Sequence, residues 1–202
     1  GPDFDFGSAP NEITYQAPSG PKTIIGAGQK SGIYYAMDPD TGAILWQTQV
    51  GPGGTLGGME WGSATDGQRI YVAVANNFGI PYKVGVAGSW AALDPATGKI
   101  LWQVADPNGG IDLGPVAVAN GVVFVSSMGF LYNPNSPIAN QPTMLALDAS
   151  SGATLWSYAP GSSVNAGATI VGNQVFWGSG YSHLGTGLGS GNNKFFAFTT
   201  PN

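Results

Sequence analysis

The chain has 202 residues, of which 33 are glycine and 15 are proline, and only 8% are charged. Six tryptophans, eight tyrosines and nine phenylalanines within a 43% apolar composition exclude a disordered chain, because disordered chains lack the side chains that offset the entropy of ordering. The net charge of −5 argues against nucleic acid or anionic membrane as partners, and the absence of cysteine excludes disulfides, thiolate chemistry and cysteine-based metal sites.

An apolar run followed by Asp-x-x-x-Gly and a second run ending in tryptophan occurs three times along the chain. The pattern indicates a β-hairpin, because the aspartate can bond to the following backbone amides and the glycine can adopt a positive φ. Since a residue that recurs with a repeat usually builds it, we expect the three indoles to pack between repeats and not to bind substrate. These copies end at Trp46, Trp102 and Trp156 and occupy residues 36–46, 92–102 and 146–156.

Two further β-rich runs precede each hairpin. The first hairpin begins with an expected strand at 33–37. Besides the hairpin strands, the expected strands fall, in chain order, at 11–15, 23–26, 61–64, 69–75, 116–118, 122–126, 168–171, 175–178 and 195–199. Four-stranded antiparallel units that repeat about every fifty residues are typical of β-propeller blades, and helical periodicity is absent. We therefore predict one all-β propeller segment over 1–202, with approximate blades at 1–50, 51–106, 107–160 and 161–202. A β-sandwich is the alternative, but it would not require the same hairpin at the same place three times.

The fourth set of strands stops before an outermost strand, whereas the chain begins on an innermost one. A half ring leaves two blade faces and several strand edges uncovered, which favours association. We therefore expect the chain to be the C-terminal half of a ring of about eight blades, or to pair with another chain that completes the ring.

The repeated hairpin resembles the tryptophan-docking motif of pyrroloquinoline quinone (PQQ) dependent alcohol dehydrogenases, a family of eight-bladed propellers. All three copies match Ala-x-Asp-x-x-Thr-Gly-x-x-x-Trp, with Ser151 in place of threonine in the last copy. Outside the hairpins, residues 2–10, 28–32, 57–62 and 192–198 resemble the polyvinyl alcohol dehydrogenase-like branch of that family. The resemblance covers essentially the whole chain, and it is more specific for the fold than for the activity, because nonenzymatic assembly scaffolds share the repeat.

Alcohol oxidation needs a base for the hydroxyl proton, an acceptor for the hydride and a positive charge beside that acceptor. The resemblance implies that PQQ with a calcium ion supplies the acceptor, that Asp3 or Asp5 is the base, and that Lys30 contacts the quinone oxygens. The two aspartates are alternate residues of an extended segment, so their orientation does not separate them. The alternative interpretations are solvated carboxylates near a chain end and an ordinary loop lysine.

Trp61 matches a segment near the cofactor pocket of the resembled family, where an indole can shape a substrate channel or stack on a flat ring; core packing is the rival interpretation. Glu60 points to the opposite side if this segment is extended, so we do not assign it as a ligand. The family's calcium ligands belong to the other half of the ring, and no metal ligand is assigned in this chain. His183 is the only histidine, so a loop or surface role is expected for it.

The leading hypothesis is the C-terminal part of a quinoprotein alcohol dehydrogenase that oxidises secondary or polymeric alcohols with PQQ and passes electrons to a cytochrome c. The alternatives are a nonenzymatic binding or scaffold propeller, with carbohydrate as a candidate ligand, and a fragment without independent activity. No apolar run is long enough to span a bilayer as a helix. The composition and the resemblance favour a periplasmic or secreted protein.

Overall fold

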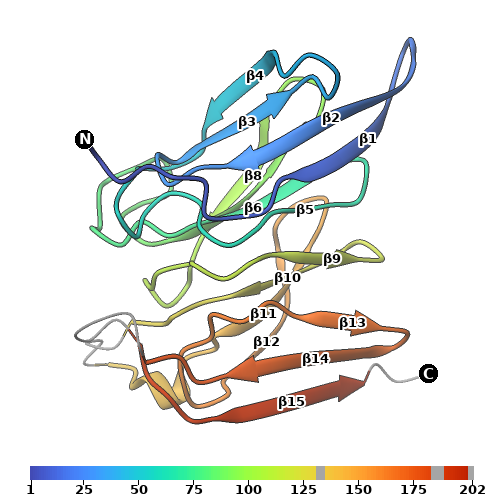
Figure 1. Cartoon of the computed structure of the whole chain (residues 1–202). Coiled ribbons are helices and arrows are strands. Elements are labelled where there is room, and N and C mark those ends of the chain that lie inside the picture. The colour runs from blue at the N-terminus through green and yellow to red at the C-terminus, as the bar shows by residue number, and fades with distance from the viewer. Residues whose placement is uncertain (131–134, 183–188, 200–202) are drawn as a thin grey trace.

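The computed structural model describes residues 1–130, 135–182 and 189–199, and His183 lies outside them. Its strands form four antiparallel sheets in which neighbours in space are neighbours in sequence (Figure 1). The first sheet contains β1 (Asn11–Ala17), β2 (Gly20–Gly28), β3 (Ile33–Met37) and β4 (Ile44–Gln49). The second contains β5 (Ala64–Thr65), β6 (Ile70–Val74), β7 (Ser89–Leu93) and β8 (Ile100–Ala105).

The third sheet contains β9 (Ala117–Ala119), β10 (Val122–Ser126), β11 (Met144–Asp148) and β12 (Thr154–Tyr158), with the 3-10 helix η1 (Ile138–Asn140) before β11. The fourth contains three strands in the described residues, β13 (Thr169–Val171), β14 (Gln174–Ser179) and β15 (Lys194–Thr199). The predicted fold is confirmed: the molecule is an open arrangement of propeller-like sheets, about half of an eight-bladed ring.

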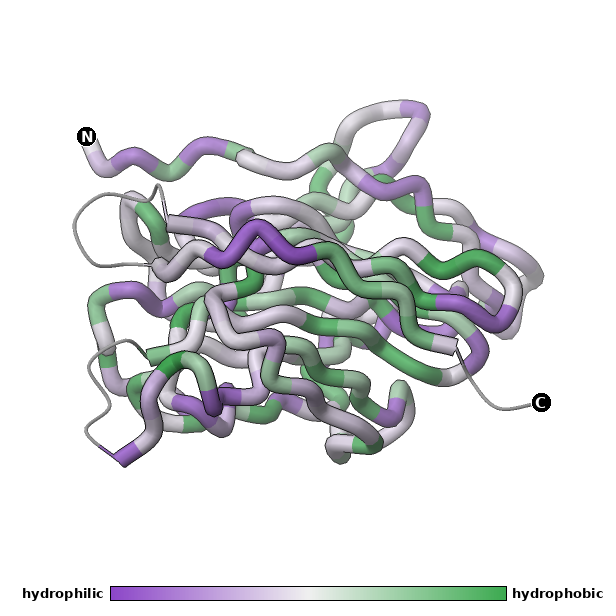
Figure 2. The backbone as a smooth tube through the Cα atoms, turned by 90° about the horizontal axis from the view of Figure 1, so that it is seen from below, coloured by the Kyte–Doolittle hydropathy of each residue, from purple (hydrophilic) through white to green (hydrophobic). Residues whose placement is uncertain are grey.

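The sheets lie side by side, with the first strand of each on the inner side of the arc. β1 lies beside β5, and β5 lies beside β9. Apolar side chains fill the space between successive sheets, as where Tyr34 and Ala36 of β3 pack with Ile70 and Leu93 of the second sheet. Seen from below, the hydrophobic stretches follow the strands, and the N-terminal segment runs along one side of them (Figure 2). Each core is thus shared by two sheets and depends on both.

The innermost strand of the second sheet is shorter than predicted. Residues 61–63 are not part of β5, which holds only Ala64–Thr65. Gly62 has a φ of 136°, a conformation outside the strand region, and its carbonyl accepts a hydrogen bond at 3.2 Å from the amide of Val116, the residue before β9. The backbone here therefore bonds to the segment that leads into the next sheet and not to a strand of its own sheet.

The hairpins between the third and fourth strands are held as the sequence predicts. Asp38 Oδ1 accepts hydrogen bonds from the backbone amides of Asp40 and Thr41, at 3.1 and 2.8 Å, and from the Thr41 hydroxyl at 2.8 Å. The same three bonds recur around Asp94 and, with serines, around Asp148. These bonds fix the turn locally, which explains why the same hairpin forms in three sheets.

The hairpins of the second and third sheets also receive an indole from the preceding sheet. Trp46 Nε1 donates a hydrogen bond to the carbonyl of Pro95 at 3.0 Å, and Trp102 Nε1 donates one to the carbonyl of Ala149 at 3.0 Å. A Cβ atom on Gly152 would lie 2.7 Å from Cε3 of Trp102, so the indole can approach the turn only because that residue is glycine. The tryptophan of one sheet is therefore fitted to the glycine turn of the next.

Two glycines have nearly the same backbone conformation but different surroundings. Alanine variants at these two positions therefore distinguish the energetic cost of a positive φ from the cost of a clash with the indole. Gly42 and Gly152 have φ of 72° and 75°, but within 4 Å of a Cβ on Gly42 there is no heavy atom of the described chain. We expect Gly42→Ala to lower the free energy of unfolding by about 1 kcal/mol. Gly152→Ala should cost about 1–3 kcal/mol more, because its methyl group would overlap Trp102. Urea unfolding of both variants measures the difference, and equal losses would contradict the role given to the indole.

Trp156 has a different environment from Trp46 and Trp102. In the described residues no glycine turn follows β15, and Trp156 lies against Phe198 and Tyr158 with ring centroids 4.9 and 5.9 Å away. Its side chain borders an apolar groove of about 580 Å³ between the third and fourth sheets, which Phe124 and Leu155 also line. The third indole therefore packs on aromatic side chains and remains 38% exposed.

Candidate functional site

One polar residue per sheet occupies the same place just before the innermost strand. These corner residues stand two positions before a glycine, in Asp5-Phe-Gly, Glu60-Trp-Gly, Asp112-Leu-Gly and Asn165-Ala-Gly. Three of the four have buried oxygens that lack a hydrogen-bond partner in the described structure: Glu60 Oε1, both carboxylate oxygens of Asp112, and Asn165 Oδ1. Burial raises the pKa of Asp112 well above its ordinary value, and the nearby Asp106 raises it further.

The corner of the first sheet is distinguished by a cation. Lys30 stands five residues after Ile25 of β2, which pairs with Met37. The positions equivalent to Lys30 in the second and third sheets are Ala75 and Met128, and both side chains are fully buried. A lysine at a position that is otherwise apolar is a departure from the repeat, and such departures gather at functional sites.

Three of the four predicted site residues meet at this corner. Lys30 Nζ lies 2.7 Å from Asp5 Oδ1 and 3.3 Å from Asp3 Oδ2, and the Lys30 amide donates to the Asp5 carbonyl at 3.1 Å. The carboxylates are exposed, whereas the lysine side chain is only 13% exposed. The contact with Lys30 lowers the pKa of Asp5, and its partner Asp5 raises the pKa of Lys30. Lys30 is therefore a fixed cation at neutral pH.

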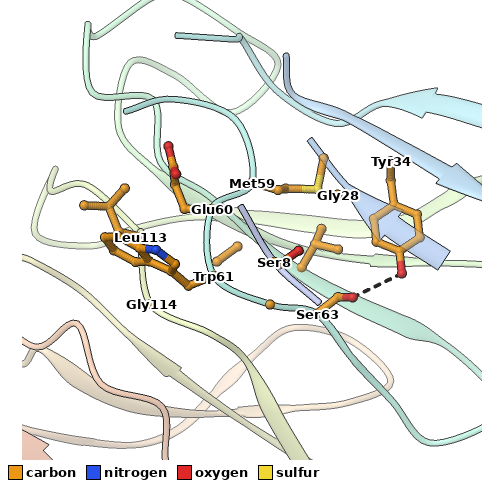
Figure 3. Close-up of a pocket in the computed structure, with 12 residues that line it drawn as sticks. Ser8, Gly28, Tyr34, Met59, Glu60, Trp61, Ser63, Leu113 and Gly114 are labelled. Carbon is orange, nitrogen blue, oxygen red and sulfur yellow. Dashed lines mark hydrogen bonds between the residues drawn. The ribbon is translucent and has the colours of Figure 1, made fainter. Parts of the chain in front are cut away.

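Glu60 belongs to the same electrostatic group, although side-chain alternation along the chain does not predict this. Glu60 and Trp61 leave the backbone in different directions, as the alternation argument predicts (Figure 3). The side away from Trp61 is nevertheless the side of the charged cluster: Glu60 interacts electrostatically with Lys30, Asp5 and Asp3. Burial raises the pKa of Glu60 to about 7, an effect that Lys30 opposes and the two aspartates reinforce. A buried acid that titrates near neutrality is suited to proton transfer.

Trp61 lies on the other side of this segment. Its indole packs against a small core formed by Ala75, Leu113 and Met128. Trp61, Glu60 and Leu113 also border a cavity of about 10 Å³, which has room for about one water molecule (Figure 3). Trp61 therefore packs in a small core beside the segment that carries Glu60. Its contact with a cofactor stays a prediction.

The pH dependence of stability tests the burial of Glu60. Because its pKa in the folded chain, about 7, lies above the ordinary 4.5, folding takes up a proton between these values, and the free energy of unfolding should fall as the pH rises from 4.5 to 7. We expect this pH-dependent loss of stability to be on the order of 2 kcal/mol and Glu60→Gln to abolish it. Thermal melts across this pH range measure it, with the exposed Glu12→Gln as control; an unchanged slope in the Glu60 variant would contradict this environment.

The described residues contain neither a cluster of metal-binding side chains nor a membrane-spanning helix. Among residues 1–130, 135–182 and 189–199, no three His, Asp or Glu side chains gather closely enough to hold a metal ion. Within the described structure, no helix has the length and apolar character needed to cross a membrane.

Comparison with known proteins gives the family. A family model named PQQ_2, described as outer membrane protein assembly factor BamB, matches residues 86–194, a little over half of the chain. The chain belongs to this family. Two curated relatives are polyvinylalcohol dehydrogenases: one from Pseudomonas sp is 33% identical over 212 residues, and one from Sphingopyxis sp. (strain 113P3) is 29% identical over 209 residues. They cover 92% and 90% of this chain, and the chain spans only 30% of the length of each.

A solved structure agrees on the fold. Quinohemoprotein alcohol dehydrogenase ADHIIG from Pseudomonas putida HK5 superposes with a TM-score of 0.63 over 89% of this chain and 35% of that protein, at 16% identity. The likeness supports the propeller architecture of the sheets described above. The family match and the two relatives confirm the resemblance that the sequence motifs indicate.

Proposed function

We propose that the chain is the C-terminal part of a PQQ-dependent alcohol dehydrogenase that acts on secondary or polymeric alcohols. The observation that carries the proposal is the corner of the first sheet, where Lys30, Asp3 and Asp5 meet beside a buried acid with a pKa near neutrality. The polyvinylalcohol dehydrogenases among the relatives support the substrate class. The electron acceptor that fits such a reaction is a cytochrome c, and the expected location is periplasmic or secreted.

In this proposal the lysine of the corner stabilises negative charge and the acidic residues transfer protons. PQQ, when bound, supplies the acceptor for the hydride of the alcohol carbon. Lys30 would hold the quinone through its positive charge and would stabilise negative charge on the quinone oxygens. Asp3 or Asp5 accepts the hydroxyl proton, and Glu60 is a nearby group to which a proton can pass, since it is buried and half protonated at neutral pH. Trp61 stabilises the wall of the pocket behind Glu60.

The two implied cofactors fit these residues unequally. An anionic quinone matches Lys30, whose side chain is largely buried and interacts electrostatically with Asp3, Asp5 and Glu60. The family resemblance puts the calcium ligands in the other half of the ring, and the described residues hold no cluster of three His, Asp or Glu side chains. We therefore place the quinone contact in this chain and the calcium ligands in the part of the ring that the relatives possess beyond the matched region.

A scaffold propeller is the second candidate, because the matching family model is described as an assembly factor. A reconstitution experiment distinguishes the dehydrogenase from the scaffold. The chain is mixed with PQQ, calcium and the unmatched region of the Pseudomonas relative, and dye reduction is followed with secondary alcohols and polyvinyl alcohol. The proposed activity predicts alcohol-dependent reduction that needs both polypeptides. Folded polypeptides that associate but reduce no dye with any alcohol would favour the scaffold.

A further inference from the structure

The hairpin formed by β1 and β2 projects beyond its sheet, unlike the corresponding hairpins of the other described sheets. β1 and β2 pair as far as Ala17 with Gly20, whereas β2 begins to pair with β3 only at Ile25 with Met37. In the other three sheets, the first residue of the second strand pairs with both neighbouring strands. The projecting hairpin extends past the ends of β3 and β4 (Figure 1). Such a departure from the repeat is a candidate functional feature.

The projecting hairpin forms one wall of a groove of about 490 Å³. Tyr15 and Lys22, which pair across the hairpin, line this wall. The other walls are the turn between β3 and β4, the start of β4, and Ala96 in the corresponding turn of the second sheet. The volume lies in the range typical of ligand sites. Every wall belongs to this chain, so the groove is formed by the first two sheets alone.

The groove contains polar groups that are free to bind a ligand. Within the described residues, the Lys22 ammonium, the Asp40 carboxylate and the Tyr15 hydroxyl form no hydrogen bond or ion pair. Lysine can donate hydrogen bonds, aspartate can accept them, and the tyrosine hydroxyl can do both. An anionic ligand would meet Asp38 and Asp40, and a cationic ligand would meet Lys22. The charges therefore favour a neutral ligand that carries hydroxyl groups.

Apolar surface lies between these polar groups. Trp46 Nε1 already donates a hydrogen bond to the carbonyl of Pro95 at 3.0 Å, so the indole offers the groove its ring and not its donor. Leu45 also lines the groove and is 52% exposed. A hydrocarbon backbone can lie on such a surface while its hydroxyl groups reach the polar side chains. A polymeric alcohol combines these two features in one neutral chain.

We propose that this groove binds a segment of a polymeric alcohol at a distance from the site of oxidation. The inference rests on the proposed function for the identity of the polymer, which the names of the two relatives support. Lys22 precedes Lys30 by eight residues. At about 3.3 Å per residue along β2, roughly 26 Å separates the groove from the corner of the first sheet. Only a long chain can reach both places, and the second contact raises its effective concentration at the corner.

Calorimetric titration of the chain with polyvinyl alcohol, in the absence of PQQ, tests the groove. Lys22→Ala/Asp40→Ala removes one charge of each sign and should weaken binding by about tenfold or more, because two hydrogen bonds are lost. Glu12→Ala/Lys99→Ala is the matched control, since both residues are exposed and lie outside the groove, and it should bind as the parent chain does. A parent chain that does not bind the polymer, or equal affinities for the two paired variants, would overturn the proposal.

Two further titrations test the class of ligand and the accessibility of the groove. Polyethylene glycol and dextran of similar length should bind more weakly than polyvinyl alcohol. Tighter binding of dextran would overturn the assignment and point to a carbohydrate. The chain associated with the unmatched region of the Pseudomonas relative should keep its affinity for polyvinyl alcohol. Loss of binding in that complex would show that the groove is covered in the whole protein, which would also overturn the proposal.

Turnover distinguishes this proposal from the proposed function. In the reconstituted enzyme, Lys22→Ala/Asp40→Ala should raise KM for polyvinyl alcohol severalfold, with kcat unchanged, and leave both constants for 2-propanol as in the parent. An unchanged KM for the polymer would overturn the docking role while the oxidation of 2-propanol still supported the proposed function. Groove-dependent binding of the polymer without dye reduction by any alcohol would support the groove and contradict the proposed function alone.

Discussion

Trp102→Ala should lower the free energy of unfolding by about 3–5 kcal/mol. The indole lies between two sheets: it packs in the core that Tyr71 shares with Leu147, donates a hydrogen bond to the Ala149 carbonyl at 3.0 Å, and covers the face of Gly152. Alanine leaves a cavity at the junction and removes the donor for a carbonyl of the turn. Because each sheet is stable only through its neighbours, loss at one junction should be felt by the whole molecule. Urea denaturation measures the change.

Trp156→Ala is the matched comparison. Trp156 occupies the same place in the repeat, but it borders an open groove and packs on the aromatic rings of Tyr158 and Phe198. Its loss should cost about 1–2 kcal/mol, because part of the side chain is already in contact with solvent. Similar losses for the two variants would show that stability comes from burial of any indole and not from its fit to a glycine turn.

Lys30→Met should weaken the binding of PQQ by about ten- to a hundredfold, since a hydrogen bond to a charged group contributes about 1.5–3 kcal/mol. Methionine keeps the length of the side chain and removes the charge. The change should also raise the pKa of Glu60 further above 7, because Lys30 is the group that opposes the effect of burial there. Quenching of tryptophan fluorescence by PQQ measures binding, and a shift to higher pH in the titration of Glu60 reports the electrostatic part.

Lys22→Met controls for the loss of one positive charge. Lys22 is exposed on β2 and lies outside the corner, so binding and the titration of Glu60 should stay as in the parent chain. If the two lysine variants bind PQQ equally well, Lys30 has no special contact with the quinone and belongs to an ordinary surface ion pair.

The fold could be predicted from the sequence because its information is local and repeated. The bonds around Asp38 lie within three residues of it, and the same residues recur at Asp94 and Asp148. Such turns pair each strand with the next one in the sequence, and this pairing produces sheets whose neighbouring strands are consecutive in the chain. The sequence pattern predicts too early a start for β5, because Gly62 bonds to Val116, which is far from it in the sequence and precedes β9.

The site could be predicted only in part. The resemblance suggested Asp3, Asp5 and Lys30 separately, but their meeting depends on the register of β2 and on the bond from Lys30 to the Asp5 carbonyl, neither of which follows from spacing. Alternation along the chain predicts that Glu60 points away from Trp61, and this gave no reason to assign Glu60 to the site. Comparison of the corner residues before each innermost strand would have found it, since all four carry a side-chain oxygen two positions before a glycine.

A crystal structure of the chain soaked with PQQ and calcium tests the account most directly. We predict quinone density beside Lys30, with the ammonium turned from Asp5 toward the quinone oxygens and one aspartate free to face the substrate side. Density for PQQ elsewhere on the molecule, with Lys30 still held only by Asp3 and Asp5, would contradict the assignment of this corner to alcohol oxidation.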